Sequence, residues 1–113
     1  MSEKRSGHPG FLRVLEEVRE LHCRKSLDYG TDADPLQNIR ESAAVVNMQP
    51  WAGAILRVCD KLHRIKAFHH RGKVEFDGIE DTLLDGCAYF AIALALYREG
   101  KHEKLNAEWI EEP

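Results

Sequence analysis

A run of ten residues, 88–97, is apolar at every position, and this run constrains the fold more than any other feature of the chain. It lies in a segment with helical spacing but is too short to cross a bilayer, which takes about 20 helical residues. A helix that is apolar all round must be buried on more than one side. In a chain of 113 residues, which has room for one small domain, helices normally keep one face in water. The run therefore predicts a homodimer or homotetramer in which this helix meets a second copy of the chain.

Apolar residues recur at helical intervals along most of the sequence, and no stretch alternates as a strand does. Helices are expected at four places, which are about 10–26, 35–47, 50–71 and 78–99. The expected fold class is thus all-α, a single four-helix bundle-like domain over 1–113. We expect a loose tail at 1–8 and a short polar tail at 101–113.

Local signals predict where these helices begin and end. Asp34 followed by Pro35 is typical of a helix start, with the aspartate as N-cap and the proline as the first helical residue. Asp77 and Glu80 have the spacing of a capping box and are expected to open the last helix. Gly100 is expected to end it.

Charge and composition exclude several classes of function. The 16 Lys and Arg residues are outnumbered by 19 Asp and Glu, so we expect no stable binding to nucleic acid. The polar N-terminal residues show no signal peptide, which predicts a cytoplasmic protein without a membrane partner. Three widely spaced cysteines, Cys23, Cys59 and Cys87, are expected to be small buried side chains in a reducing compartment.

Acidic residues form the constellation with the clearest chemical meaning. Asp81 and Asp85 are four residues apart and share a helix face. Asp60 approaches them if the third and fourth helices pack antiparallel, and three hard oxygen ligands on neighbouring helices suit Mg²⁺. Glu20 is a fourth candidate ligand. The alternative is structural, because carboxylates at these positions also pair with nearby arginines, form a solvated face or complement a helix dipole.

A second group of residues is suited to holding a nucleotide. The candidate substrate-binding residues are Lys25, Asp28, Tyr29, Asn38, Lys61 and Arg64. The first four flank the junction of the first two helices, where a base or sugar could be held. The two cations on the third helix are candidates for phosphate contacts. Alternatively, Tyr29 and the glycine after it form an ordinary helix end.

Three segments resemble the MazG-like, all-α nucleoside triphosphate pyrophosphohydrolases, in particular their phage and bacterial branch associated with nucleotide modification. The segments are Lys25-x-x-Asp28-Tyr29-Gly30, Asp60-Lys61-x-x-Arg64 and Asp81-Thr82-Leu83-Leu84-Asp85-x-x-x-Tyr89, and the likeness spans about residues 20–98. The resemblance implies a dimeric or tetrameric hydrolase that cleaves a (deoxy)nucleoside triphosphate to monophosphate and pyrophosphate with Mg²⁺. It assigns catalysis and metal binding to Asp60, Asp81 and Asp85, with Glu20 as a further metal ligand.

Two other functions remain open. The signature of the family consists of E-E-x-x-E on one helix and E-x-x-D on a later helix. In this chain the second motif is replaced by the pair Asp81-x-x-x-Asp85. A site short of carboxylates predicts a module that sequesters a nucleotide without cleaving it. Separately, Arg57 with His63 and Arg64 with His69 satisfy the loose Arg-x(4–6)-His pattern of HEPN ribonucleases, which predicts metal-independent RNA cleavage that needs one of the two histidines.

Overall fold

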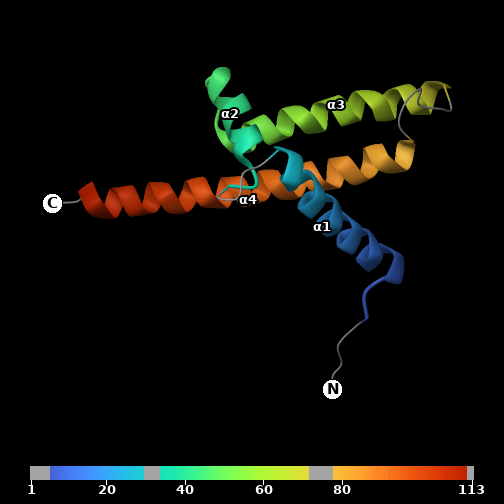
Figure 1. The fold of residues 1–113 in the computed structure, drawn as a ribbon, viewed down its shortest axis with the longest axis horizontal. Helices are drawn as coiled ribbons and strands as arrows, with labels where there is room; N and C mark the ends of the chain where they lie inside the picture. Colours follow the sequence, from blue (N-terminus) through green and yellow to red (C-terminus); the bar gives the residue numbers. More distant parts are fainter. Residues whose placement is uncertain (1–5, 30–33, 72–77, 112–113) are drawn as a thin grey trace.

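The computed structural model describes residues 6–29, 34–71 and 78–111, and it describes only the backbone of Tyr29 and of residues 102–111. The described residues form four helices and contain no strand. The helices are α1 (Pro9–Tyr29), α2 (Gln37–Val45), α3 (Pro50–Arg71) and α4 (Ile79–Glu111) (Figure 1). The predicted all-α, four-helix fold class is therefore confirmed.

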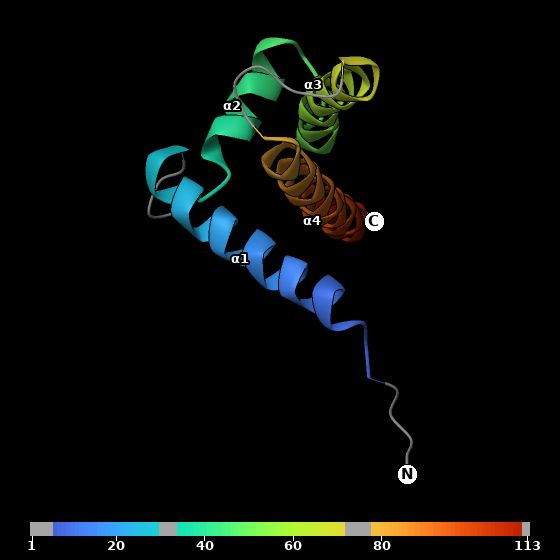
Figure 2. The ribbon, with the colours of Figure 1, turned by 90° about the vertical axis from the view of Figure 1, so that its right-hand side faces the viewer.

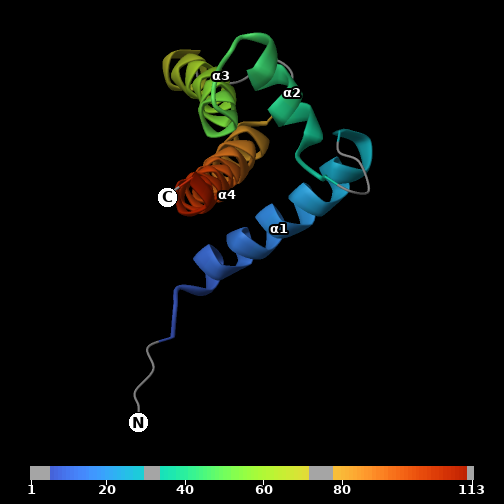
Figure 3. The same cartoon turned by 90° about the vertical axis from the view of Figure 1, so that its left-hand side faces the viewer.

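Helix α4 is the centre of the arrangement. It runs antiparallel to α3, as predicted, and these two helices make the most extensive contact in the molecule (Figure 1). Seen along α4, α3 and α1 lie on different sides of it, and α2 bridges from α3 to the C-terminal end of α1 (Figures 2 and 3). Among the described residues, no helix is long and apolar enough to span a membrane.

Helix α2 begins two residues later than the sequence predicts. The Asp34 side chain accepts a hydrogen bond from the Leu36 N–H at 3.0 Å, and the Asp34 carbonyl accepts one from the Gln37 N–H at 3.2 Å. These bonds close a turn before the helix, so Asp34 acts as a turn residue and Pro35 lies in the turn. At the other end Asn47 has φ 57°, a left-handed conformation that asparagine tolerates and that redirects the chain into α3.

The prediction that Gly100 ends the last helix is wrong, because α4 continues to Glu111. One glycine inside a helix costs about 1 kcal/mol relative to alanine. The following residues contain no proline before position 113 and are mostly good helix formers, so the helix passes through the segment predicted as a polar tail. Asp77, the predicted cap of α4, lies outside the described residues, as do residues 1–5 of the predicted N-terminal tail.

Small side chains fill the core of the subunit. The buried residues are Ala43, Thr82, Ala54, Val58, Ala88, Ala93 and Leu96. Gly53 is buried where α2 crosses α3, and a Cβ atom on it would lie 2.9 Å from the Ala43 Cβ. The helices therefore approach each other closely and enclose little volume.

All three cysteines are exposed, so the prediction that they are buried is wrong. In two cases the adjacent residue takes the inward position: Val58 beside Cys59 and Ala88 beside Cys87. Successive residues on a helix are turned by about 100°, so only one of each pair can face the core.

The chain exposes much more surface than a compact monomer does. Its accessible area is 9072 Å², whereas a folded monomer of 12.9 kDa is expected to expose about 6,300 Å². Its radius of gyration is 17.5 Å, against roughly 13 Å for a compact chain of this length. Large apolar side chains on α1, α3 and α4 contribute to this excess.

Candidate functional site

Asp85 joins three helices through two ion pairs. The Lys25 Nζ of α1 donates to the Asp85 Oδ1 at 3.3 Å, and the Lys61 Nζ of α3 lies 3.2 Å from the Asp85 Oδ2. The Asp85 and Lys61 side chains are 19% and 17% exposed, whereas Lys25 is 43% exposed. Both distances exceed the roughly 2.7–2.9 Å of a tight charge-assisted bond, so these are long ion pairs.

A cavity of about 190 Å³ lies beside Asp85, between α1, the first turn of α2, α3 and α4. Its polar lining residues are His22, Lys25, Ser26, Asn38, Arg57, Asp85 and Tyr89. Its apolar lining residues are Leu21, Pro35, Leu36, Ile39, Ala88 and Ile92. We call this cavity the Asp85 pocket.

The Asp85 pocket carries an excess of positive charge. Among the described residues that line it, Asp85 is the only carboxylate, while Lys25 and Arg57 are both cationic. Lys61 adds a further cation behind Asp85. One carboxylate cannot neutralise three cations, and the partly enclosed setting strengthens their field. The pocket therefore favours an anionic ligand.

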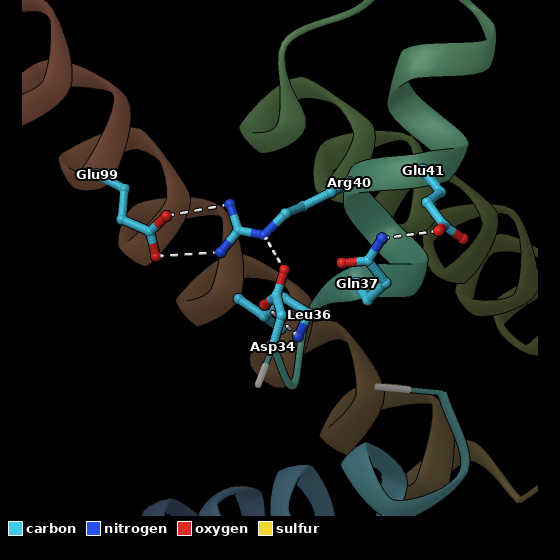
Figure 4. Close-up of polar contacts among 6 residues, drawn as sticks. All are labelled: Asp34, Leu36, Gln37, Arg40, Glu41 and Glu99. Carbon is cyan, nitrogen blue, oxygen red and sulfur yellow. Dashed lines mark hydrogen bonds and ion pairs between the residues drawn. The ribbon is translucent and has the colours of Figure 1, made fainter. Parts of the chain in front are cut away.

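The wall that α2 contributes to the pocket is held in place by Arg40 (Figure 4). The Arg40 Nε donates to the Asp34 Oδ2 at 2.6 Å, while its two terminal nitrogens lie 3.0 and 3.3 Å from the two carboxylate oxygens of Glu99. This forked contact fixes the first turn of α2 to α4. The Arg40 hydrogen bond holds the pKa of Asp34 below its usual range, and the bonds to Glu99 and Asp34 raise the pKa of Arg40.

A second cavity, of about 220 Å³, lies one turn earlier along α4, where the N-terminal half of α1 passes over it. Its lining includes the carboxylates Glu17, Glu80 and Asp81. Asp81 therefore faces this second cavity, whereas Asp85, four residues later, lines the first. Asp81 and Asp85, two of the three predicted catalytic residues, share a helix face but line neighbouring cavities.

The structure does not bring the predicted metal ligands together. Asp60 is exposed and neighbours Lys61, so the helix turn of about 100° that directs Lys61 toward Asp85 directs Asp60 away. Glu20 is exposed and lies about 160° around α1 from His22, which lines the pocket.

Across residues 6–29, 34–71 and 78–111, no group of three or more His, Cys, Asp or Glu side chains is placed to hold a metal ion. Asp60, Asp81, Asp85 and Glu20 thus do not fit Mg²⁺ together in this arrangement. Magnesium binding by these residues stays a prediction from the sequence.

The predicted substrate residues divide between the pocket and its surroundings. Lys25 and Asn38 line the Asp85 pocket, and Lys61 reaches Asp85 from behind it. Arg64 is half-buried on α3 and is not part of the pocket lining. Asp28 is exposed near the end of α1. The side chain of Tyr29 lies outside the described residues.

Sequence reasoning missed three residues of this region. His22 is spaced three residues before Lys25, so helical periodicity places both on one face of α1. Arg57, which lines the pocket, is not among the predicted substrate-binding residues. Arg40 gave no local signal, because its partner Glu99 is 59 residues away.

The two Arg/His pairs of the ribonuclease pattern are not brought together. Arg57 and His63 are about 120° apart around α3, and Arg64 and His69 are about 140° apart. Arg57 faces the pocket, whereas both histidines are exposed.

Comparison with known proteins found no family model, no curated protein and no solved structure that matches this chain. A fold of this kind hosts many functions, so a function must be inferred from the residues of the site. The Asp85 pocket is the site that offers such residues.

Proposed function

We propose that this chain binds a nucleoside triphosphate in the Asp85 pocket and cleaves it to the monophosphate and pyrophosphate. The observation that supports binding is the gathering of Lys25, Arg57 and His22 with the Tyr89 ring in one cavity. Cationic side chains suit phosphates, and an aromatic ring with an apolar wall suits a base. The reaction is the one implied by the sequence resemblance.

The volume of the Asp85 pocket indicates which part of the nucleotide it holds. At about 190 Å³ it is smaller than the roughly 300–1,000 Å³ of most ligand sites, so it takes the base or sugar. The phosphates then lie at its edge, over Lys25 and toward Lys61 behind Asp85. When phosphate oxygens replace Asp85 as partners of the two lysines, the Asp85 carboxylate becomes available as a general base. Water activated by Asp85 attacks the α-phosphorus, the bond to the bridging oxygen breaks, and pyrophosphate leaves.

The experiment is incubation of the protein with each NTP and dNTP in Mg²⁺, with products separated by ion-exchange chromatography and a parallel series in EDTA. We expect monophosphate and pyrophosphate from at least one nucleotide. We expect no product in EDTA, because Mg²⁺ would be held largely by the phosphates of the nucleotide itself. Asp85→Asn should abolish turnover yet retain the nucleotide, because it removes the base and leaves the lysines. Glu16→Gln is the matched control, since Glu16 is 59% exposed and pairs with Arg19 on the same helix.

Each other outcome has a definite meaning. A nucleotide that is retained but not cleaved would leave binding standing and overturn the reaction, as expected of a sequestering module. Full activity of Asp85→Asn would overturn the role of Asp85. RNA cleavage that persists in EDTA and is lost in His63→Ala would favour the ribonuclease. Neither binding nor turnover of any nucleotide would overturn the proposal.

We also propose that the chain works as a homodimer or homotetramer. The excess area of roughly 2,800 Å² over a compact monomer supports this, because a stable interface buries only about 800 Å² on each partner.

A further inference from the structure

One face of α4 carries a regular stripe of exposed side chains. These are Leu83, Cys87, Phe90, Leu94 and Tyr97, which are separated in turn by four, three, four and three residues. The four largest are between 50% and 58% exposed, and Cys87 is exposed as well. We call this stripe the α4 seam.

The spacing of the α4 seam is that of the a and d positions of a coiled coil. All five residues fall within an arc of about 80° around the helix, over a length of about 21 Å. The buried residues Thr82, Ala93 and Leu96 lie outside this arc, on the sides that face the rest of the subunit. The subunit makes contacts of its own at both ends of the seam. Leu83 and Cys87 line the second cavity with Val14 of α1, and the centroid of the Tyr97 ring lies 5.8 Å from that of the Trp51 ring of α3. The seam is thus a second apolar face that the subunit covers only in part.

We propose that the α4 seam is where a second copy of the chain docks, with the two α4 helices antiparallel about a two-fold axis. A seam that presents the same apolar surface along its length is self-complementary, which a two-fold interface requires. The exposed area in excess of a compact monomer is also more than a stable dimer needs to bury. This inference does not depend on nucleotide binding.

Charge at the two ends of the seam supports the antiparallel orientation. Glu80 is exposed at the N-terminal end, whereas Arg98 and Lys101 are exposed at the C-terminal end. Antiparallel pairing sets the acidic end of one helix against the basic end of the other and opposes the two helix dipoles. Parallel pairing would set like charges side by side at both ends.

The test of the seam is the mass of the full chain in solution, measured by light scattering and by sedimentation at micromolar concentrations. We expect the wild type to have twice the 12.9 kDa chain mass and Phe90→Glu to weaken association by roughly a hundredfold, since it buries a charge in the interface. A tetramer that Phe90→Glu reduces to a dimer would equally support the seam. Far-UV circular dichroism shows whether the variant keeps its helices.

Matched controls distinguish the seam from other apolar surfaces. Leu62→Glu on α3 and Leu12→Glu on α1 change side chains that are 56% and 50% exposed, and neither should alter the mass. A monomeric wild type would overturn the proposal. So would a dimer that Leu62→Glu or Leu12→Glu dissociates and Phe90→Glu does not.

Two further measurements test the seam even if Phe90→Glu fails to fold. With Cys23 and Cys59 changed to serine, a short bismaleimide should cross-link two chains through Cys87, whereas a chain that keeps only Cys59 should not cross-link. Glu80→Lys and Arg98→Glu should each weaken the dimer, and the double variant should restore it. A dimer that fails to cross-link through Cys87 would overturn the seam as the interface. A double variant that does not restore the dimer would overturn the antiparallel orientation.

Discussion

The inward and outward sides of α4 have opposite compositions. The buried inward residues are Thr82, Ala88 and Ala93, which are small, and one leucine, Leu96. The outward residues of the seam include Leu83, Phe90, Leu94 and Tyr97, which are all large and apolar. A monomer normally places its largest apolar side chains inside. The reversal indicates that the small side chains serve close packing within one subunit, while the large ones are available to a second subunit.

The same division separates the proposed chemistry from the proposed assembly. Asp85 lies on an inward side of α4, where lysines from α1 and α3 reach it. The seam lies on the other side and carries no charge between its two ends. Substitutions in the seam should therefore leave nucleotide binding largely unchanged, and substitutions at Asp85 should leave association largely unchanged.

Overpacking of the inward side should have the largest effect on stability. Ala93 is 5% exposed, so Ala93→Leu should lower the free energy of unfolding by about 3 kcal/mol. Ala95→Leu, on an exposed position of the same helix, should change it by less than about 0.5 kcal/mol. Urea unfolding at equal protein concentrations measures both. Equal effects would mean that α4 has no distinct inward side.

The close approach of α2 to α3 is tested at Gly53. Gly53→Ala places a Cβ atom 2.9 Å from the Ala43 Cβ and should cost about 2 kcal/mol, because one of the helices must move. Gly86→Ala meets no atom within 4 Å and should stabilise α4 by about 0.5–1 kcal/mol. Thermal unfolding that shifts the two variants in the same direction would contradict this packing.

Helical periodicity was sufficient to predict much of the fold. It predicted the fold class and all four helices, and α3 agrees at both ends with the predicted range 50–71. The antiparallel α3–α4 pair follows instead from the short connector between these two helices. It did not predict the continuation of α4 past Gly100, because a glycine stop requires a left-handed residue that sequence alone does not establish. The exposed cysteines were missed because a residue type sets only an average burial.

The contacts of Arg40 with Asp34 and Glu99, which we call the Arg40 clamp, should contribute less to the free energy of unfolding than these packing effects. Arg40→Met removes the bonds to Asp34 and Glu99 and should lower the free energy of unfolding by about 1 kcal/mol, since the clamp is partly exposed. It should also weaken nucleotide binding, because α2 forms one wall of the Asp85 pocket. Arg19→Met, at an exposed ion pair, is the control for both measurements. Unchanged binding in Arg40→Met would mean that the clamp does not position the pocket.

The smallest expected effect is a dependence of stability on pH through Asp34. Its pKa is held below the usual value by Arg40, so the charged carboxylate stabilises the folded chain. That contribution is complete above about pH 4 and is lost as the pH falls through the lowered pKa. The stability difference between wild type and Asp34→Asn should therefore be largest at neutral pH and shrink at pH values below about 4. Urea unfolding of the two proteins at neutral pH and below about pH 4 measures this difference. A difference in stability that stayed constant between the two conditions would contradict the prediction.

The candidate site was harder to predict than the fold. Asp85, Lys25 and Asn38 were identified from the sequence, and they line one pocket. The grouping with Asp60 could not be checked by periodicity, because the direction of a side chain depends on how two helices are rotated about their axes. That rotation is set by packing between distant residues.

The most direct test of the central claim is nucleotide binding to the Asp85 pocket. The four NTPs and four dNTPs would be titrated calorimetrically in EDTA into wild type, Arg57→Gln and Arg19→Gln. We predict that at least one nucleotide binds, that Arg57→Gln raises its Kd by about tenfold or more, and that Arg19→Gln changes it by less than about twofold. Absence of binding, or equal effects of the two substitutions, would contradict a nucleotide site at Asp85.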